Sequence, residues 1–227
     1  MIGVTENLRK IRDLLAATAE QAGRSRDSVK LLAVSKKQPV AAVAEAAAAG
    51  QLDFGENQVQ EGIEKITEIA NPGLTWHFIG HLQTNKTRAV AEHFSWVHSV
   101  DRLKTARRLS DQRPEVLGDL NVCIQVNIDD ETSKSGISPD ETGDLAAAIM
   151  ELPRIRLRGL MCLPAIRDEF EAQRVPFRRL RELGDELRGN GLPIDTLSMG
   201  MSADFRAAIF EGSTIVRIGT AVFGPRS

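Results

Sequence analysis

The sequence predicts an α/β protein that folds as a single (β/α)8 TIM barrel with a lead-in helix at its N-terminus. The chain has 227 residues, of which 42% are hydrophobic, and barrels of this type commonly use about 200–250 residues as one domain. Short apolar runs alternate with helical patterns, which is typical of β-α-β units with parallel strands. These runs do not alternate in polarity, as expected for strands buried on both faces. We therefore expect residues 1–227 to form one barrel domain.

The first elements carry the signals of a lead-in helix, a strand and a crossover helix. A helix is expected from Thr5, an N-cap residue type, to Gly23, because apolar residues follow at helical spacing. The apolar run 31–35 predicts the first strand. Pro39 then begins an alanine-rich helix that ends at Gly50, since proline favours the first turn of a helix and glycine its end.

The same strand-helix unit recurs along the rest of the chain. Further strands are expected at 52–54, 75–79, 96–99, 122–128, 155–161, 196–198 and 214–218. The helices between them are expected at 59–69, 85–93, 103–111, 140–151, 169–188 and 203–210. With the first strand this makes eight strands, and eight such units over this length favour a closed barrel over an open sheet.

Composition and charge exclude several classes of function. Because 29 Lys and Arg are balanced by 31 Asp and Glu, the chain has no overall attraction to nucleic acid or anionic lipid. No apolar run approaches the roughly 18 residues of a membrane span, and the N-terminus lacks the pattern of a signal or transit peptide. We therefore expect a cytoplasmic protein. Cys123 and Cys162 lie far apart and are expected to be buried hydrophobes rather than a disulfide or metal pair.

Barrels of this class carry their chemistry at the C-terminal ends of their strands, so the residues there are the candidates for function. Lys36 directly follows the first strand. A partly desolvated lysine has a lowered pKa and can condense with an aldehyde to form a Schiff base. The alternative is that Lys36 and Lys37 are two solvated loop lysines, and strand parity does not choose between the two residues.

Two segments rich in glycine and serine follow the seventh and eighth strands, where barrels often bind phosphate. Residues 198–202 end at a predicted helix N-terminus, and Gly219 and Thr220 follow the last strand. Backbone N–H groups and hydroxyls there would suit a phosphate. The alternative is that Ser202 only caps a helix and the glycine only allows a tight turn. A Schiff-base lysine facing a phosphate site would indicate a phosphorylated aldehyde, such as pyridoxal 5′-phosphate or a sugar phosphate.

Metal binding is not expected from the sequence. His77 and His81 lie four residues apart, but on a strand and its exit they would not share one metal-binding face. The glycine-rich nucleotide motifs of other folds and the serine elbow of hydrolases are absent from the sequence. Trp76 and Trp96 lie on apolar strands and are expected in the core.

Several motifs resemble one known family, in the same order along the chain. They are LAVSK (32–36), FGEN (54–57), WHFIGHLQTNK (76–86), SKSG (133–136), GLM (159–161), LSMGMS (197–202) and VRIGT (216–220). On these motifs the chain resembles the pyridoxal phosphate homeostasis proteins, the YggS/PROSC family. The resemblance implies a barrel similar to the N-terminal domain of alanine racemases, with pyridoxal 5′-phosphate (PLP) as the cofactor.

The resemblance also implies roles for individual residues around the cofactor. Lys36 would form the Schiff base with PLP. Other residues would hold the phosphate or lie around the mouth of the site. These are Ser202, Gly219 and Thr220 at the phosphate, with backbone help near Gly200, and Asn57 and His81 at the mouth, with Lys134 nearby.

Among these residues, Arg217 is the one expected to affect the chemistry of the cofactor most. In the similar racemase barrels, an arginine of this motif faces the pyridine nitrogen of PLP. Because arginine is a permanent donor, it cannot protonate that nitrogen, and the cofactor becomes a weak electron sink. The alternative is that Arg217 merely pairs with a carboxylate at the barrel rim.

We therefore expect a PLP carrier that buffers the cofactor through a reversible Schiff base and maintains vitamin B6 homeostasis without catalytic turnover. PLP-dependent apoenzymes are candidate acceptors, a monomer is favoured by the resemblance, and neither nucleic acid nor membrane is an expected partner. The main alternative is a PLP-dependent amino-acid racemase or a related PLP enzyme. Known alanine racemases have a barrel similar to the one expected here and, in addition, a second β domain that contributes a tyrosine. This chain has no Tyr and no room for that domain. Two further alternatives are a Schiff-base aldolase acting on a sugar phosphate and a protein-interaction module.

Overall fold

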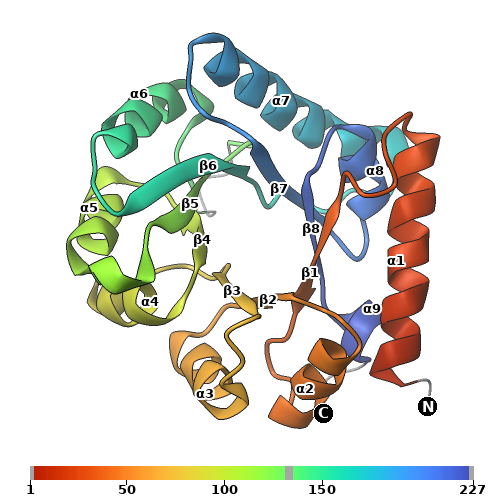
Figure 1. Ribbon diagram of the computed structural model, residues 1–227. Helices are drawn as coiled ribbons and strands as arrows, with labels where there is room; N and C mark the ends of the chain where they lie inside the picture. The colour runs from red at the N-terminus through yellow and green to blue at the C-terminus, as the bar shows by residue number, and fades with distance from the viewer. Residues whose placement is uncertain (1–2, 131–134, 225–227) are drawn as a thin grey trace.

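The computed structural model describes residues 3–130 and 135–224. Within these residues, eight parallel strands pair in chain order and β8 pairs with β1, so the sheet closes into a barrel with helices around it (Figure 1). The predicted (β/α)8 fold is therefore confirmed. The strands are β1 (Lys30–Val34), β2 (Asp53–Glu56), β3 (Thr75–Phe78), β4 (Trp96–Val100), β5 (Leu120–Gln125), β6 (Ile155–Met161), β7 (Thr196–Met201) and β8 (Ile215–Ile218). The helices are α1 (Val4–Gln21), α2 (Val40–Ala48), α3 (Val59–Ile69), α4 (Thr87–His93), α5 (Leu103–Gln112), α6 (Pro139–Met150), α7 (Phe170–Gly189), α8 (Phe205–Phe210) and α9 (Thr220–Phe223), with short 3-10 turns η1 (Thr84–Lys86) and η2 (Glu115–Leu117).

The predicted elements differ from the structure mainly at their ends. The strand predicted at 122–128 ends at Gln125, because the backbone N–H of Asn127 pairs with the carbonyl of Ile137 and the chain leaves the sheet there. The strand predicted at 196–198 extends to Met201. The helix α9 is not predicted, since four residues are too few to show a helical period.

The lead-in helix α1 packs on the outside of the barrel against α2, α8 and α9, on the side where β1 meets β8 (Figure 1). The predicted N-cap is wrong: the helix begins at Val4, and Gly3 precedes it in extended conformation. Its predicted apolar face points toward the barrel and excludes water from its closing seam, except for Leu14, which is 42% exposed. The buried members are Val4, Leu8, Ile11, Leu15, Thr18 and Ala19.

Residues 3–130 and 135–224 were compared with the requirements of a membrane-spanning helix, a metal site and a disulfide. None of the helices described there could span a bilayer, and no His, Cys, Asp and Glu side chains there gather into a metal site. Both cysteines are buried thiols, as expected. Burial raises the pKa of the Cys123 thiol to about 12, so this residue packs as a small apolar side chain against Trp96 and Met161.

Two buried histidines occupy the barrel interior, which in most barrels is filled by branched apolar side chains. His77 on β3 and His98 on β4 are both fully buried, and Nδ1 of His77 lies 2.9 Å from Nε2 of His98. Trp96 stacks on His77 with ring centroids 5.3 Å apart, and both Trp96 and Trp76 are in the core as predicted. Burial lowers the pKa of both imidazoles, that of His98 more strongly. Both rings are therefore neutral at pH 7.

Because of these histidines, we expect the free energy of unfolding to decrease as the pH falls from about 7 to about 5. In the unfolded chain a histidine takes up a proton near pH 6.5, whereas the buried rings stay neutral to lower pH. The unfolded state then binds more protons, which lowers the free energy of unfolding by up to about 1.4 kcal/mol per pH unit for each histidine. Urea unfolding of the wild type and of His98→Gln over this range measures the difference. The variant should show the shallower slope, and equal slopes would contradict the assignment.

Candidate functional site

A cavity of about 920 Å³ opens at the C-terminal ends of the strands. This is the end at which such barrels carry their sites, and the volume is in the range of small-molecule pockets, about 300–1,000 Å³. The loop after β6 contributes an apolar part of the wall, with Leu163 and Ile166. Seven residues that the sequence nominates for the site line this one cavity: Lys36, Asn57, His81, Ser202, Arg217, Gly219 and Thr220.

The structure distinguishes the two lysines that follow β1. Lys36 is half-buried and lines the cavity together with Val34, which lies two residues before it on the same face of the strand. Lys37 is exposed, has a left-handed backbone with φ of 58° and donates its N–H to Oε1 of Glu61 outside the barrel. The reading of both residues as solvated loop lysines is therefore wrong for Lys36.

A buried ion pair fixes the turn that presents Lys36. Nζ of Lys65 on α3 lies 2.7 Å from Oε1 of Glu56 and 2.7 Å from Oε1 of Glu61, and it donates to the carbonyl of Ser35 at 2.6 Å. The Ser35 hydroxyl donates to the same Glu56 oxygen at 2.6 Å. Burial raises the pKa of the Glu56 carboxyl, against the opposing effects of Lys65 and Ser35. The residue before Lys36 is thus held through both its backbone and its side chain.

This cluster was not predicted. Glu61 and Lys65 are spaced i,i+4 on a helix, which is a visible signal but one that usually indicates an exposed pair. Only the packing of α3 on the barrel shows that Lys65 is 4% exposed and that Glu56 is fully buried. The sequence alone does not show that these side chains support the lysine.

The mouth of the cavity is formed by the exits of β2 and β3. A Cβ on Gly80 would lie 2.2 Å from the carbonyl oxygen of Asn57, so only glycine allows these two segments to approach so closely. Asn57 is half-buried, whereas His81 is exposed and its Nδ1 lies 3.3 Å from the hydroxyl of Ser135. Lys134, expected near the mouth, lies outside the described residues.

Small residues after β7 and β8 form the opposite wall. Gly200, expected near the phosphate, lies within β7 and does not line the cavity; it has a φ of 94°, and a Cβ there would lie 2.6 Å from that of Ala208. α8 begins at Phe205 and Asp204 precedes it, with Oδ1 of Asp204 accepting the backbone N–H of Met201 at 2.6 Å. Ser202 is therefore not the helix cap, and the alternative reading of this residue is wrong. Its side chain is exposed on the cavity wall.

Arg217 on β8 forms the floor of the cavity and is 4% exposed. Its Nη1 donates to the carbonyl and the hydroxyl of Ser198 at 2.6 and 2.8 Å, and its Nη2 donates to the carbonyl of Cys162 at 2.9 Å. Within the described residues no carboxylate forms an ion pair with it, so the rim-pairing alternative is wrong. Burial lowers the pKa of the guanidinium, but arginine keeps its proton at any pH relevant to proteins.

A second ion pair orders the apolar wall. Oδ2 of Asp129, after β5, accepts the backbone N–H of Ala165 at 2.7 Å, and both carboxylate oxygens of Asp129 contact the guanidinium of Arg167. The loop after β6 is thereby tied to the loop after β5. This clamp was also missed, because its partners lie in segments far apart in the sequence.

The donors around the cavity fit the phosphorylated aldehyde that the resemblance implies. A half-buried amine can attack an aldehyde carbon, while hydroxyls and glycine backbone on the far wall suit a phosphate. A Cβ on Gly219 would lie 3.0 Å from the carbonyl oxygen of Val34. A side chain at this position would crowd the cavity wall, so glycine keeps the backbone there accessible to a ligand. The cationic floor at Arg217 favours an electron-rich ring atom over a cation.

Comparison with known proteins gives the family. Residues 6–227 match the family model of the alanine racemase N-terminal domain. The chain is 56% identical to the pyridoxal phosphate homeostasis protein of Pseudomonas aeruginosa over 100% of this chain and 97% of that protein, and 54% identical to that of Escherichia coli K12 over 100% and 98%. This chain belongs to the pyridoxal phosphate homeostasis protein family. The recognition from sequence motifs is thus confirmed.

Solved structures agree with this family membership. PipY of Synechococcus elongatus has been solved without PLP and with PLP bound; the chain is 38% and 37% identical to these, with TM-scores of 0.87 and 0.85 over 97% of this chain and 100% of PipY. Alanine racemase of Corynebacterium glutamicum shares the fold alone, at 19% identity and a TM-score of 0.71 over 94% of this chain and 62% of the racemase. The homeostasis family therefore has the barrel expected from the resemblance.

We expect Lys65→Met to lower the free energy of unfolding by about 3–5 kcal/mol, because it leaves the Glu56 carboxyl buried without its ammonium partner. The double variant Glu56→Gln/Lys65→Met removes both charges and should be less destabilised than the single variant. Urea unfolding at pH 7 measures both values. A double variant that is at least as unstable as the single one would show that the pair is not the source of the effect.

Proposed function

We propose that this protein carries and buffers PLP in the cell by holding it reversibly at Lys36, and that it thereby maintains vitamin B6 homeostasis. The observation that carries this proposal is the convergence of a half-buried lysine, a buried arginine and a hydroxyl- and glycine-lined wall in one cavity. The names of the curated relatives and the PLP-bound PipY structure support it. When bound, PLP supplies an aldehyde that condenses with a lysine amine and loses one water.

Each wall of the cavity has a proposed task toward the cofactor. Lys36 provides the amine, and the ion pair behind Ser35 holds it at the cavity. Ser202, Thr220 and the backbone at Gly219 bind the phosphate with N–H and O–H donors. Arg217 donates to the pyridine nitrogen. Asn57 and His81 lie at the mouth and contact the cofactor from the side of β2 and β3.

The absence of turnover is part of the proposal, and Arg217 is its main support. A guanidinium keeps its proton, so the ring nitrogen accepts a hydrogen bond without gaining a positive charge, and the ring stabilises a carbanion poorly. Among the described residues that line the cavity, Lys36 and His81 are the side chains that can exchange a proton. A racemase needs two such groups on opposite faces. Among these described residues His81 is the one that could serve as the second, and steady conversion of an enantiopure amino acid that depends on His81 would favour the racemase alternative.

The exposed mouth suits a carrier that gives PLP up to other proteins. Met201, Ser202 and His81 are exposed around it, so the bound cofactor remains within reach of water and of an acceptor. We propose that residues 1–227 act as one domain and as a monomer, that the protein works in the cytoplasm, and that PLP-dependent apoenzymes receive the cofactor.

Lys36→Ala should abolish covalent PLP binding, whereas the matched variant Lys37→Ala should retain it. The first change removes the amine inside the cavity, and the second removes an exposed amine beside it. Visible absorbance of the purified proteins, before and after borohydride reduction, followed by mass mapping of the modified lysine, gives the answer. A reduced adduct on Lys37 or Lys134 of the wild type would move the site, and a wild type that forms no adduct after PLP addition would defeat the proposal.

Ser202→Ala should weaken PLP retention more mildly, by about tenfold or less, since one of several phosphate hydrogen bonds is lost. The PLP dissociation rate in dialysis or in transfer to an apoenzyme measures this. The absorbance of the bound form should not change, because the linkage at Lys36 is untouched. Unchanged retention would place Ser202 outside the phosphate site.

A further inference from the structure

Five side chains from five different strands form one continuous series of hydrogen bonds through the barrel interior. Oδ1 of Asp53 lies 3.0 Å from Nε2 of His77, Nδ1 of His77 lies 2.9 Å from Nε2 of His98, and Nδ1 of His98 lies 2.8 Å from the hydroxyl of Ser198. The Ser198 hydroxyl in turn accepts from Nη1 of Arg217 at 2.8 Å. The series therefore ends at the floor of the PLP cavity.

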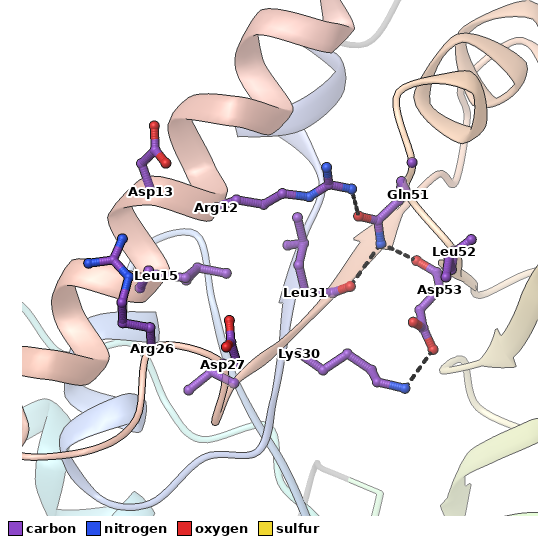
Figure 2. Close-up of a pocket in the computed structure, with 13 residues that line it drawn as sticks. Arg12, Asp13, Leu15, Arg26, Asp27, Lys30, Leu31, Gln51, Leu52 and Asp53 are labelled. Carbon is purple, nitrogen blue, oxygen red and sulfur yellow. Dashed lines mark hydrogen bonds and ion pairs between the residues drawn. The ribbon is translucent and has the colours of Figure 1, made fainter.

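The other end of the series lies at the opposite rim of the barrel. Asp53 and Lys30 line a separate pocket of about 400 Å³ at the amino-terminal ends of β1 and β2, and their side chains are joined at 3.0 Å (Figure 2). Burial acts to raise the pKa of the Asp53 carboxyl, but the hydrogen bond with His77 and the ion pair with Lys30 together bring it below its usual range. Asp53 is therefore ionised at neutral pH and can only accept.

The two ends fix the direction of every hydrogen bond between them. Because the ionised Asp53 can only accept, the neutral His77 carries its proton on Nε2, donates to Asp53 and leaves Nδ1 as an acceptor. His98 must then donate to it from Nε2, and Nδ1 of the neutral His98 accepts the Ser198 proton. Arginine has donors only, so the Ser198 oxygen also accepts from Arg217. All donors point from Arg217 toward Asp53, and both rings are neutral with the same tautomer.

The charges around the series are consistent with this arrangement. Beyond burial, Asp53 acts to raise the pKa of His77 and Lys30 acts to lower it, while Arg217 and Lys30 both act to lower the pKa of His98. Cations on both sides oppose a third positive charge on His98. A proton added to His77 would make Nδ1 a donor and would force the bonds to His98 and Ser198 to reverse, next to the Arg217 charge.

We propose that Asp53, His77, His98 and Ser198 form a positioning relay that orients Arg217 toward the cofactor; the inference deepens the proposed function and rests on it for the identity of the ligand. The relay turns an oxygen lone pair of Ser198 toward the guanidinium. Of the five N–H groups of arginine, three are occupied within the described residues, by the two Ser198 oxygens and the carbonyl of Cys162. Under this proposal the two that are left serve a ligand in the cavity that Arg217 lines.

The first test measures the tautomers of the histidines and needs neither PLP nor a substitution in the relay. The full chain, labelled with ¹⁵N-histidine, contains four histidines, and long-range ¹H–¹⁵N NMR distinguishes the two ring nitrogens. His81→Gln and His93→Gln identify the two signals outside the relay. At neutral pH, His77 and His98 should both be neutral with the proton on Nε2. A proton on Nδ1 of either ring, or a charged ring, would overturn the relay even if PLP binds at Lys36.

The second test measures PLP retention in relay variants. Ser198→Ala should speed PLP dissociation about tenfold, as expected for one lost hydrogen bond to a charged group, whereas Ser198→Thr keeps the hydroxyl and should restore retention. His98→Phe should have the same effect as Ser198→Ala, and the double variant should be no worse than either, because the two act in series. Cys123→Ala, a buried change against Trp96 outside the relay, is the matched control and should retain PLP like the wild type.

The outcomes separate the relay from the proposed function. Multiplicative losses in the double variant, or equal losses in Cys123→Ala, would show a general effect of the core and would reject the relay. Retention unchanged in Ser198→Ala would also reject it. A wild type that binds no PLP would remove the proposed function, while the histidine tautomers would still decide the relay.

Discussion

The hydrogen-bonded pairing of β1 with β8 brings together residues from the two ends of the chain, and the site depends on it. Leu32 pairs with Arg217 across this seam, and parallel strands present all their C-terminal ends at one rim. Lys36 after β1 therefore faces the same cavity as Gly219 and Thr220 after β8. In an open sheet with the same strand order, these residues would lie at opposite edges. Closure of the barrel thus creates the site, and α1 covers the closing seam from outside.

Two buried cations support the cavity in different ways. Lys65 is a compact, strongly hydrated charge, and its burial is offset by two carboxylates. Arg217 is delocalised and more weakly hydrated, and three hydrogen bonds to neutral oxygens hold it, each worth about 1.5–3 kcal/mol when the donor is charged. A carboxylate beside Arg217 would neutralise it and occupy its donors. Neutral partners instead leave its charge and two of its N–H groups unpaired among the described residues, as the proposed role in holding a ligand requires.

The sequence predicts those features of the molecule that are set locally. Apolar runs and helical periods are local patterns, so they predict the order of strands and helices. Once that order predicts a barrel, the residues at the C-terminal ends of the strands are the candidate site residues. Side-chain direction at Lys36 depends on register with β2 and β8, and a shift of one residue would have selected Lys37 instead. The interpretation of Ser202 as a cap failed because α8 begins two residues later than predicted. The hydrogen bond between His98 and Ser198 joins residues 100 positions apart in the sequence, so no local sequence pattern could predict it.

Reversible carriage requires that retention and release depend on different parts of the site. Under the proposed function, retention comes from the interior, where Arg217 and its buried partners are dry and fixed. Release requires water to reach the linkage at Lys36, and it is controlled at the mouth, where Ser202 and His81 are exposed and the described chain places no second domain over them. An enzyme of the same fold benefits from a covered site, because exclusion of water strengthens each electrostatic contact and protects reactive intermediates. A carrier gains from the opposite arrangement, since an accessible linkage is one that water or an acceptor amine can break.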